Sequence, residues 1–411
     1  MAHFQFTGSF IDCRWCRLDG VSCIDIGATE ERLESGRANE NGELSPPWGF
    51  GSTLCTPMKT TVRSQTQALR ARDREAWAAL FGVDKRSLAV LRIGLSLLLI
   101  YNGLAGGLVY PRMEGTGGFF AHPDVVVIPF AVLLLVGIQT RLVTILCWLI
   151  FSHGVRIGLT TPELAVPLAN YVLSLALFWG VFLPLGARAS IDARRRPDHR
   201  PITFASVASA GLLIQVAFIY FSGGVMKSFG EWVLQATALD QVLGSDRYGS
   251  VLGQTLTQFP HLLAGLSIAT IALELIGPIL LFVPGARLSR RRIILVVMFF
   301  GLQVAMAMFM KLGLFPYVLM LIWCVFLPTQ FWDRVTRRRS AEKENPPTHD
   351  IDTNRWRRLL GTAALALIVI SNLLTWVYYP ADQGIPGWIQ TAARYVTLYQ
   401  EWVMFSMPST L

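Results

Sequence analysis

The 411-residue chain is 53% hydrophobic and only 15% charged, well below the roughly 25% of charged residues in an average soluble domain. This composition excludes an ordinary soluble protein, because so much apolar surface must contact lipid. The formal net charge of +9 does not indicate nucleic-acid binding, since the arginines form short clusters between apolar runs rather than one basic face. We therefore expect the lipid bilayer as a partner, and no nucleic acid.

The leading segment, residues 1–57, is polar and irregular and contains no secretory signal. Its centre is rich in Glu, Asn, Gly and Pro, which predicts disorder. Met58 begins a more typical basic lead-in, residues 58–86, so 1–57 is interpreted either as a disordered extension or as the result of a mis-assigned start codon. Cys13-x-x-Cys16 lacks a second pair at finger-like spacing, so we predict no metal site.

Apolar runs between residues 87 and 379 predict an all-α bundle that crosses the membrane about nine times. The second run is short and is separated from the third only by residues 139–141, which indicates a tight helical hairpin or a re-entrant pair. The expected spans are Ser87–Tyr110, Val125–Ile138, Leu142–Gly158, Ala165–Leu185, Phe204–Val225, Leu262–Val283, Ile293–Met310, Leu314–Phe331 and Leu359–Tyr379.

The distribution of Lys and Arg predicts the orientation, because basic residues near span ends are retained in the cytoplasm. With the amino terminus inside, twenty-four basic residues fall on the cytoplasmic side in 61–86, at Arg141, and in 186–202, 284–292 and 330–358, and five fall in the opposite loops. The carboxyl terminus is then extracytoplasmic. Within residues 380–411, the aromatic stripe of the segment Trp388–Trp402 predicts an amphipathic helix on the outer membrane surface.

Ionisable groups inside a membrane are costly, so they are the first candidates for a functional site. The segment Tyr220–Trp232 contains a Gly-Gly pair followed by Lys227 and Glu231. If the helix continues through the glycines, Tyr220, Lys227 and Glu231 share one face near the outer boundary. A partly desolvated Lys227 is a candidate proton acceptor. The alternative is a lysine that extends to the interface and pairs with Glu231.

Glu274 lies in the middle of the sixth predicted span, where a carboxylate must be protonated or paired. Arg92, Arg156 and Lys227 are its possible partners, in a structural ion pair or in a proton relay. His153 and Arg156 are one turn apart and are candidates to line the same cavity. Gln303, a neutral polar residue of the seventh predicted span, is a further candidate for the site. Four methionines of the seventh span are interpreted as packing residues, with a wall for a quinone or lipid tail as the alternative: Met298, Met306, Met308 and Met310.

Several short motifs occur in a characteristic order on this multispan chain, and in that order they resemble the HTTM proteins. The membrane domain of that family is similar to that of vitamin K-dependent gamma-carboxylase. The resemblance runs from about Ala76 to the carboxyl terminus. Its motifs are Leu91-Arg92-Ile93-Gly94, Gly137-x-x-Thr140-Arg141, Leu183-Pro184-x-Gly186 with Ser190-x-Asp192, Tyr220-Phe221-x-x-Gly224-x-x-Lys227-x-x-x-x-Trp232, and Gln400-Glu401-Trp402-Val403-Met404-Phe405.

The resemblance implies that Lys227 occupies the position of the base that deprotonates reduced vitamin K in the carboxylase. It also implies a catalytic face on the non-cytoplasmic side. The chain departs from the carboxylase in two ways: Gln303 stands where the carboxylase has a histidine, and the large carboxyl-terminal lumenal region is missing.

Two functions are therefore expected to compete. The first is an enzyme of the bacterial inner (plasma) membrane that binds a reduced quinone or a similar lipid, with Lys227 as proton acceptor and Glu274, Gln303 and Arg156 shaping the site. The second is a non-catalytic protein that holds a lipid or acts as an export or immunity component. A transporter is a weaker third interpretation, because no inverted repeat is visible.

Overall fold

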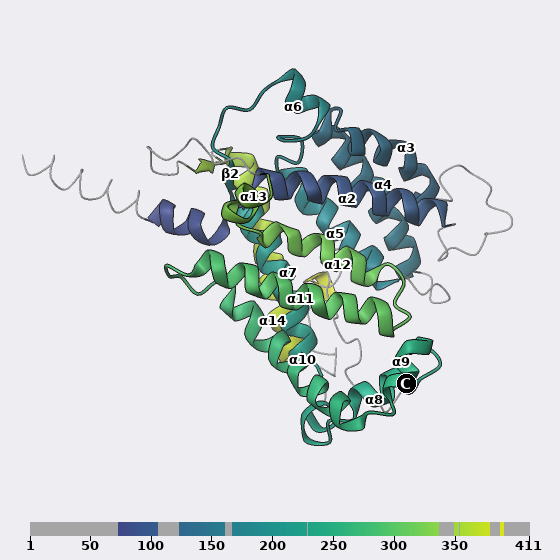
Figure 1. Ribbon diagram of the computed structural model, residues 1–411. Helices are drawn as coiled ribbons and strands as arrows, with labels where there is room; N and C mark the ends of the chain where they lie inside the picture. Colours follow the sequence, from purple (N-terminus) through teal and green to yellow (C-terminus); the bar gives the residue numbers. More distant parts are fainter. Residues whose placement is uncertain are drawn as a thin grey trace, which may run out of the picture. The chain divides into compact units, whose positions relative to one another are not determined.

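The computed structural model describes residues 73–105, 123–160, 167–227, 229–336, 349–352, 354–378 and 387–389 (Figure 1). The chain divides into two compact units, Met1–Ala76 and Trp77–Leu411, and every element named below belongs to the second. The segment 1–57, most of the tail 380–411 and the closing motif 400–405 lie outside the described residues.

Within the described residues, five helices are long and apolar enough to cross a membrane, and each corresponds to one of the predicted spans. Each of these helices starts or ends within a few residues of the apolar run that predicted it. They are α2 (Lys85–Leu104), α7 (Val207–Val225), α10 (Pro260–Leu280), α11 (Leu288–Phe309) and α14 (Arg355–Tyr378).

Three other predicted spans correspond to α3 (Pro123–Val136), α4 (Thr140–Thr160) and α5 (Leu168–Phe182). The α3–α4 hairpin turns at Gly137 and Gln139, which both have positive φ. With 15 residues, α5 is about 22 Å long, shorter than the roughly 30 Å hydrocarbon layer. The nine-span count therefore stays a prediction.

The eighth predicted span is not one straight helix. It comprises α12 (Phe315–Trp323), the 3-10 turn η4 (Cys324–Phe326) and α13 (Thr329–Val335), with a bend of 101° before α13. Pro328 stands at the bend and cannot continue a helix, because its nitrogen has no hydrogen to donate. The bent pair is either a broken span, which would be the sixth candidate span among the described residues, or a re-entrant loop.

A small sheet, absent from the expected all-α fold, joins three distant loops. Strand β2 (Thr203–Ala205) pairs antiparallel with β1 (Val83–Asp84) and parallel with β3 (Asp350–Ile351). Beside it, Lys85 is fully buried and donates to Asp198 at 2.7 Å and to Asp350 at 2.9 Å. Strands this short carry no periodic signal, which is why the sequence did not predict them.

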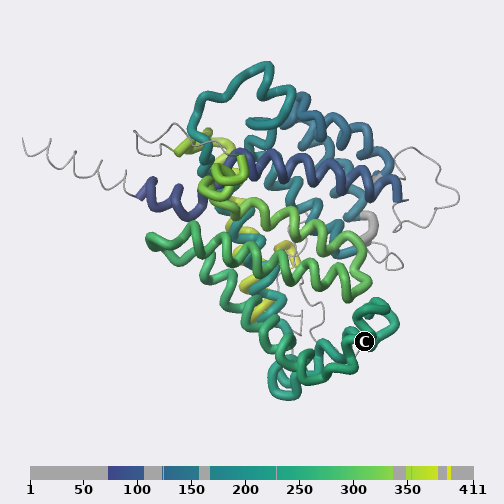
Figure 2. Tube along the Cα trace, in the orientation of Figure 1, coloured from purple at the N-terminus to yellow at the C-terminus, as the bar shows by residue number. Residues whose placement is uncertain are grey.

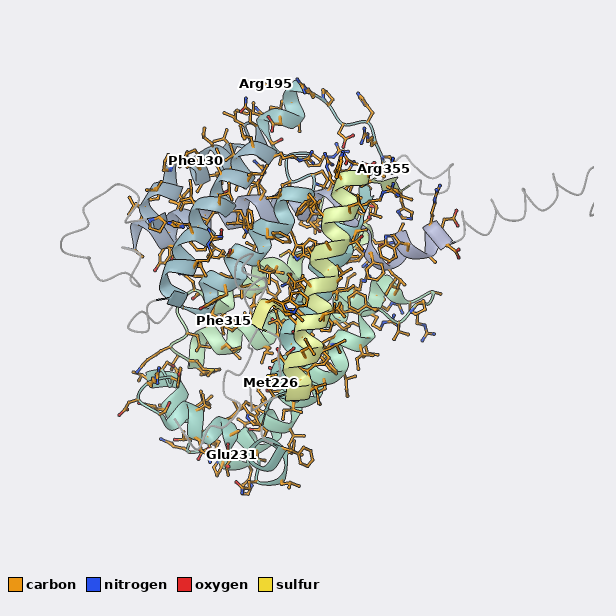
Figure 3. The ribbon with its side chains drawn as sticks, turned by 180° about the vertical axis from the view of Figure 1, so that it is seen from behind. Phe130, Arg195, Met226, Glu231, Phe315 and Arg355 are labelled. Atoms are coloured by element: carbon orange, nitrogen blue, oxygen red, sulfur yellow. The ribbon has the colours of Figure 1, made fainter. Side chains whose placement is uncertain are left out.

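The sheet lies at the end of the bundle where the basic loops meet. Arg292 donates to the carbonyl of Leu80, which brings the loop between α10 and α11 to this end as well. Arg195 and Arg355 lie toward this end in Figure 3, whereas Met226 and Glu231 lie at the other. The loops rich in Lys and Arg thus share one end of the bundle, opposite the end that carries Lys227.

Candidate functional site

Lys227 lies just beyond the end of α7. The helix ends at Val225 with Met226 as its C-cap, and the chain bends at Lys227 before a π-helical turn, η3 (Gly230–Leu234). The helix therefore includes both glycines but ends before Lys227 and Glu231, so it does not place these two residues on one helical face with Tyr220. Glu231 lies in η3 and is half-buried, and Figure 3 shows it farther from the bundle than Met226.

The ion pair of Lys227 is with Glu274 of α10. Its Nζ donates to Oε2 of Glu274, and the two side chains are only 6% and 11% exposed. The same Nζ lies 3.4 Å from the carbonyl oxygen of Gly223 and 4.9 Å from the ring centre of Trp232. Of the three cationic partners expected for Glu274, the structure thus selects Lys227. The ammonium of Lys227 is surrounded by a carboxylate, a backbone carbonyl and an aromatic ring.

Gly224 allows α7 and α10 to approach closely enough for this pair. A Cβ at position 224 would lie 2.9 Å from Cδ2 of Leu275 and 3.2 Å from Cβ of Glu274. A Cβ at Gly223 would instead lie 3.8 Å from Lys227 Nζ, which is ordinary contact. Of the two glycines, therefore, only Gly224 is required by the packing.

The ion pair forms part of the wall of a cavity of about 440 Å³. This volume is within the roughly 300–1,000 Å³ of typical small-molecule pockets. Almost all the remaining wall is apolar and comes from η3, α8 (Ala238–Gly244), α9 (Val251–Leu256), α10 and α11. Figure 2 shows residues 230–310, which supply most of this wall, as one continuous run of teal to green tube. Three of the four methionines singled out in the sequence line the cavity: Met298, Met306 and Met310.

Tyr220 and Gln303 form a separate buried network next to this site. Nε2 of Gln303 donates to the hydroxyl of Tyr220 at 2.9 Å, and Nε1 of Trp323 donates to the same oxygen at 2.8 Å. Oε1 of Gln303 has no partner among the described residues, although the side chain is fully buried. Neither Tyr220 nor Gln303 is among the residues that line the cavity. Sequence reasoning missed Trp323, because an indole in an apolar run resembles any core residue.

His153 and Arg156 lie on α4, away from the cavity wall formed by the described residues. His153 is exposed and borders a shallow pocket of about 200 Å³ with Pro123 and Leu149. Arg156 is half-buried. The structure therefore brings together Lys227 and Glu274, and Tyr220 and Gln303, but it does not bring His153 or Arg156 to the Lys227 cavity.

Arg92 has a structural role instead of pairing with Glu274. It is fully buried, and its guanidinium donates to the carbonyls of Leu134 and Leu135, each at 2.9 Å, and to that of Ala189. The first two carbonyls belong to the last turn of α3, where a cation satisfies unpaired acceptors and complements the helix dipole. The early Arg92 motif and the loop after α5 therefore meet at one helix end.

Asp192, which follows the loop after α5, stabilises the start of α4 with hydrogen bonds. Its carboxylate accepts from the backbone N–H of Gln139 at 3.0 Å, and from the backbone N–H and the hydroxyl of Thr140, each at 2.7 Å. Burial by itself raises the pKa of Asp192, but these hydrogen bonds outweigh it and lower the pKa below its ordinary value. The motifs around Gly137 and Ser190 therefore contact each other, and the second stabilises the turn that contains the first.

No group of three His, Cys, Asp or Glu that could hold a metal ion is found within the described ranges. The one sequence spacing that resembles zinc ligands, Cys13 and Cys16 with Cys23, lies outside them.

A family model for the HTTM domain matches residues 124–332, just over half of the chain. The chain belongs to the HTTM family. The match runs from α3 into α13 and includes Lys227, Glu274 and Gln303, so the ion pair lies within the matched region. No curated protein and no solved structure matches the chain. The long apolar helices and the family together identify an HTTM membrane protein.

Proposed function

We propose that this HTTM protein binds a reduced quinone or a similar neutral amphiphile in the cavity of about 440 Å³, with the hydroxyl group of the ligand at the Lys227–Glu274 pair. The observation that carries the proposal is an ion pair in an otherwise apolar wall. An apolar pocket with a few convergent polar groups is the usual form of a small-molecule site. Ionisable residues are retained at such depth mainly where they serve a function.

The pair can take up a proton in two linked transfers. Glu274 accepts a proton from the Lys227 ammonium, which leaves a neutral amine. That amine then accepts the proton of the ligand hydroxyl: the O–H bond breaks, an N–H bond forms, and the oxygen keeps the electron pair. Such general-base catalysis requires the hydroxyl within about 3 Å of Nζ. Gly223 and Trp232 hold Nζ at the cavity wall for this contact.

The alternative is a non-catalytic protein that binds a lipid or serves as an export or immunity component. Gln303 supports it, because an amide cannot transfer a proton in the way a histidine does. Gln303 also donates to Tyr220 and does not line the cavity. In this case the same cavity holds a lipid and the ion pair only orients it.

One experiment separates these two functions. The protein is reconstituted in vesicles, and binding and aerobic oxidation of decylubiquinol are measured for the wild type and for Lys227→Arg. Deprotonated quinols react faster with dissolved oxygen, so the wild type should accelerate oxidation. Lys227→Arg should bind decylubiquinol but lose the acceleration. If the wild type binds decylubiquinol but does not accelerate its oxidation, the catalytic function is refuted and the non-catalytic function is supported.

We also propose nine spans, a cytoplasmic amino terminus and an extracytoplasmic carboxyl terminus, in the bacterial inner membrane. The shared end of the basic loops supports this orientation, because positive loops remain in the cytoplasm. Lys227, at the opposite end, then faces the extracytoplasmic side. We further propose that the tail 380–411 lies on that outer surface, since Trp388 is 71% exposed.

A further inference from the structure

Among the described residues, the wall of the Lys227 cavity is open on one side, between α10 and α11. Four of its lining residues are exposed: Leu266 and Ala269 on α10, and Met298 and Gly301 on α11. Leu266 and Met298 have exposed fractions of 43% and 48%. Because these apolar residues belong at once to the cavity and to the outer surface, they form the rim of an opening, which we call the α10–α11 opening.

This opening lies at the depth of the lipid chains. Both helices are long and apolar enough to span the membrane. Met298 and Gly301 are near the middle of the 22 residues of α11, and Ala269 is near the middle of α10. The middle of a spanning helix lies in the hydrocarbon layer, so the opening faces acyl chains and not water.

The end of the cavity beyond the spans is closed by contrast. Trp232 of η3 is 2% exposed, and Val242 and Leu243 of α8 are 0% and 4% exposed. All three line the cavity, and they pack in one apolar cluster with Leu263 of α10. Among the described residues, therefore, the exposed part of the wall is on the lipid side.

The charges of the site restrict the head group of a ligand. Lys227 and Glu274 neutralise each other, and Thr270 adds only a hydroxyl to the wall. An anionic head group would find a cation whose charge is already matched, and would lose its hydration without compensation. An uncharged head with a hydroxyl group can exchange hydrogen bonds with the pair, while the apolar walls accept a hydrocarbon chain.

We infer that the cavity is loaded sideways from the bilayer through the α10–α11 opening, by a lipid with an uncharged hydroxyl head and a hydrocarbon chain. The head reaches the Lys227–Glu274 pair and the chain leaves through the opening into the membrane. This inference rests on the proposed binding function, and it adds the route and the class of ligand.

Two glycines provide a matched test. A Cβ at Gly301 or at Gly265 would meet no atom within 4 Å, so both positions accept a large side chain. Gly301 lines the cavity, whereas Gly265 is an exposed residue of α10 that does not. Gly301→Trp should block the opening, and Gly265→Trp should leave it free. Ala269→Trp blocks the opening from the other helix.

The probe is hexadecanol with a diazirine next to its hydroxyl group, added to phosphatidylcholine vesicles that contain the protein. Cross-links are mapped by mass spectrometry to the peptide that contains Lys227 and Trp232, where the buried Trp232 reports the closed end of the cavity. We expect cross-linking in the wild type and in Gly265→Trp, and a loss of at least tenfold in Gly301→Trp and Ala269→Trp. Diazirine-labelled palmitate, an anion, should label this peptide more weakly than hexadecanol.

The outcomes distinguish failure of the route from failure of the site. Absence of cross-links at this peptide in the wild type would refute the proposed ligand binding itself. Equal cross-linking in Gly265→Trp and in the blocked variants would refute the opening and leave binding intact. Preferred labelling by palmitate would overturn the uncharged head group. If one blocked variant aggregates on size-exclusion chromatography, the monodisperse one decides.

Discussion

Lys227 and Glu274 connect the end of α7 to the middle of α10 across 47 positions of sequence. Both charges are almost completely shielded from solvent, so each depends on the other for compensation. An isolated charge at this depth costs far more than a pair, which is why loss of one partner is more harmful than loss of both. This asymmetry can be measured.

We expect Lys227→Met or Glu274→Leu alone to lower the free energy of unfolding by about 3–5 kcal/mol, the usual cost of leaving one member of a buried pair. The double variant Lys227→Met/Glu274→Leu should recover most of this loss. Thermal unfolding in detergent measures all three. Losses that simply add in the double variant would show that the two residues do not interact.

Asp192 should make stability depend on pH. Its folded pKa is lowered by the hydrogen bonds from Thr140 and Gln139, so its contribution is present above the unfolded pKa of about 3.9 and is lost as the pH falls through the folded pKa. Asp192→Asn should cost about 2 kcal/mol at neutral pH, because charge-assisted hydrogen bonds become neutral ones. The difference from the wild type should shrink toward acidic pH in thermal scans. A constant difference at all pH values would contradict this explanation.

At the scale of elements, the contact between α7 and α10 decides whether the site exists. Gly224→Ala places a Cβ 2.9 Å from a Leu275 carbon and 3.2 Å from Glu274 Cβ, so the helices must separate by a few tenths of an ångström. We expect weaker decylubiquinol binding and a destabilisation of about 1–3 kcal/mol, the usual cost of overpacking. Binding to reconstituted protein and thermal unfolding measure these two effects.

Gly223→Ala is the matched control, since its Cβ would meet only ordinary contacts. It should bind decylubiquinol as the wild type does and lose less stability than Gly224→Ala. If the two variants behave alike, close packing at Gly224 is not what positions Lys227.

The apolar runs predicted the long helices well, because a chain in lipid must satisfy its backbone within each helix. They did not predict the bend between α12 and α13, where Pro328 interrupts an apolar run of full length. A run of apolar residues indicates burial in lipid or protein, but it does not indicate whether the helix axis stays straight along the run. The short strands and η3 depend on distant partners and left no local pattern.

At the scale of the whole molecule, the described parts of the predicted cytoplasmic loops meet at one end of the bundle. The sheet joins segments near Val83, Phe204 and Asp350, and Arg292 adds a fourth. Asp192 adds the turn at Thr140. The three-dimensional contacts therefore gather at one end of the bundle the loops that the charge count assigns to the cytoplasm.

The sidedness can be tested with single cysteines in a cysteine-free background. Arg247 lies in the exposed loop between α8 and α9, and Arg196 lies in the exposed basic loop after α6 (Ile191–Arg195). In intact cells, a membrane-impermeant maleimide should label Arg247→Cys, and should label Arg196→Cys only after permeabilisation. The reverse pattern would invert the topology and place Lys227 in the cytoplasm.

The sequence by itself determined that the protein is a helical membrane protein, where its long helices lie, and which ionisable residues fall inside the predicted spans. These properties follow from local composition, since lipid selects apolar residues turn by turn. Only the tertiary structure decided that Glu274 is the partner of Lys227, that Gln303 and Trp323 both donate to the hydroxyl of Tyr220, and that His153 lies elsewhere. Such pairings depend on how helices distant in sequence approach one another, and the small side chains that permit the approach leave no periodic trace in the sequence.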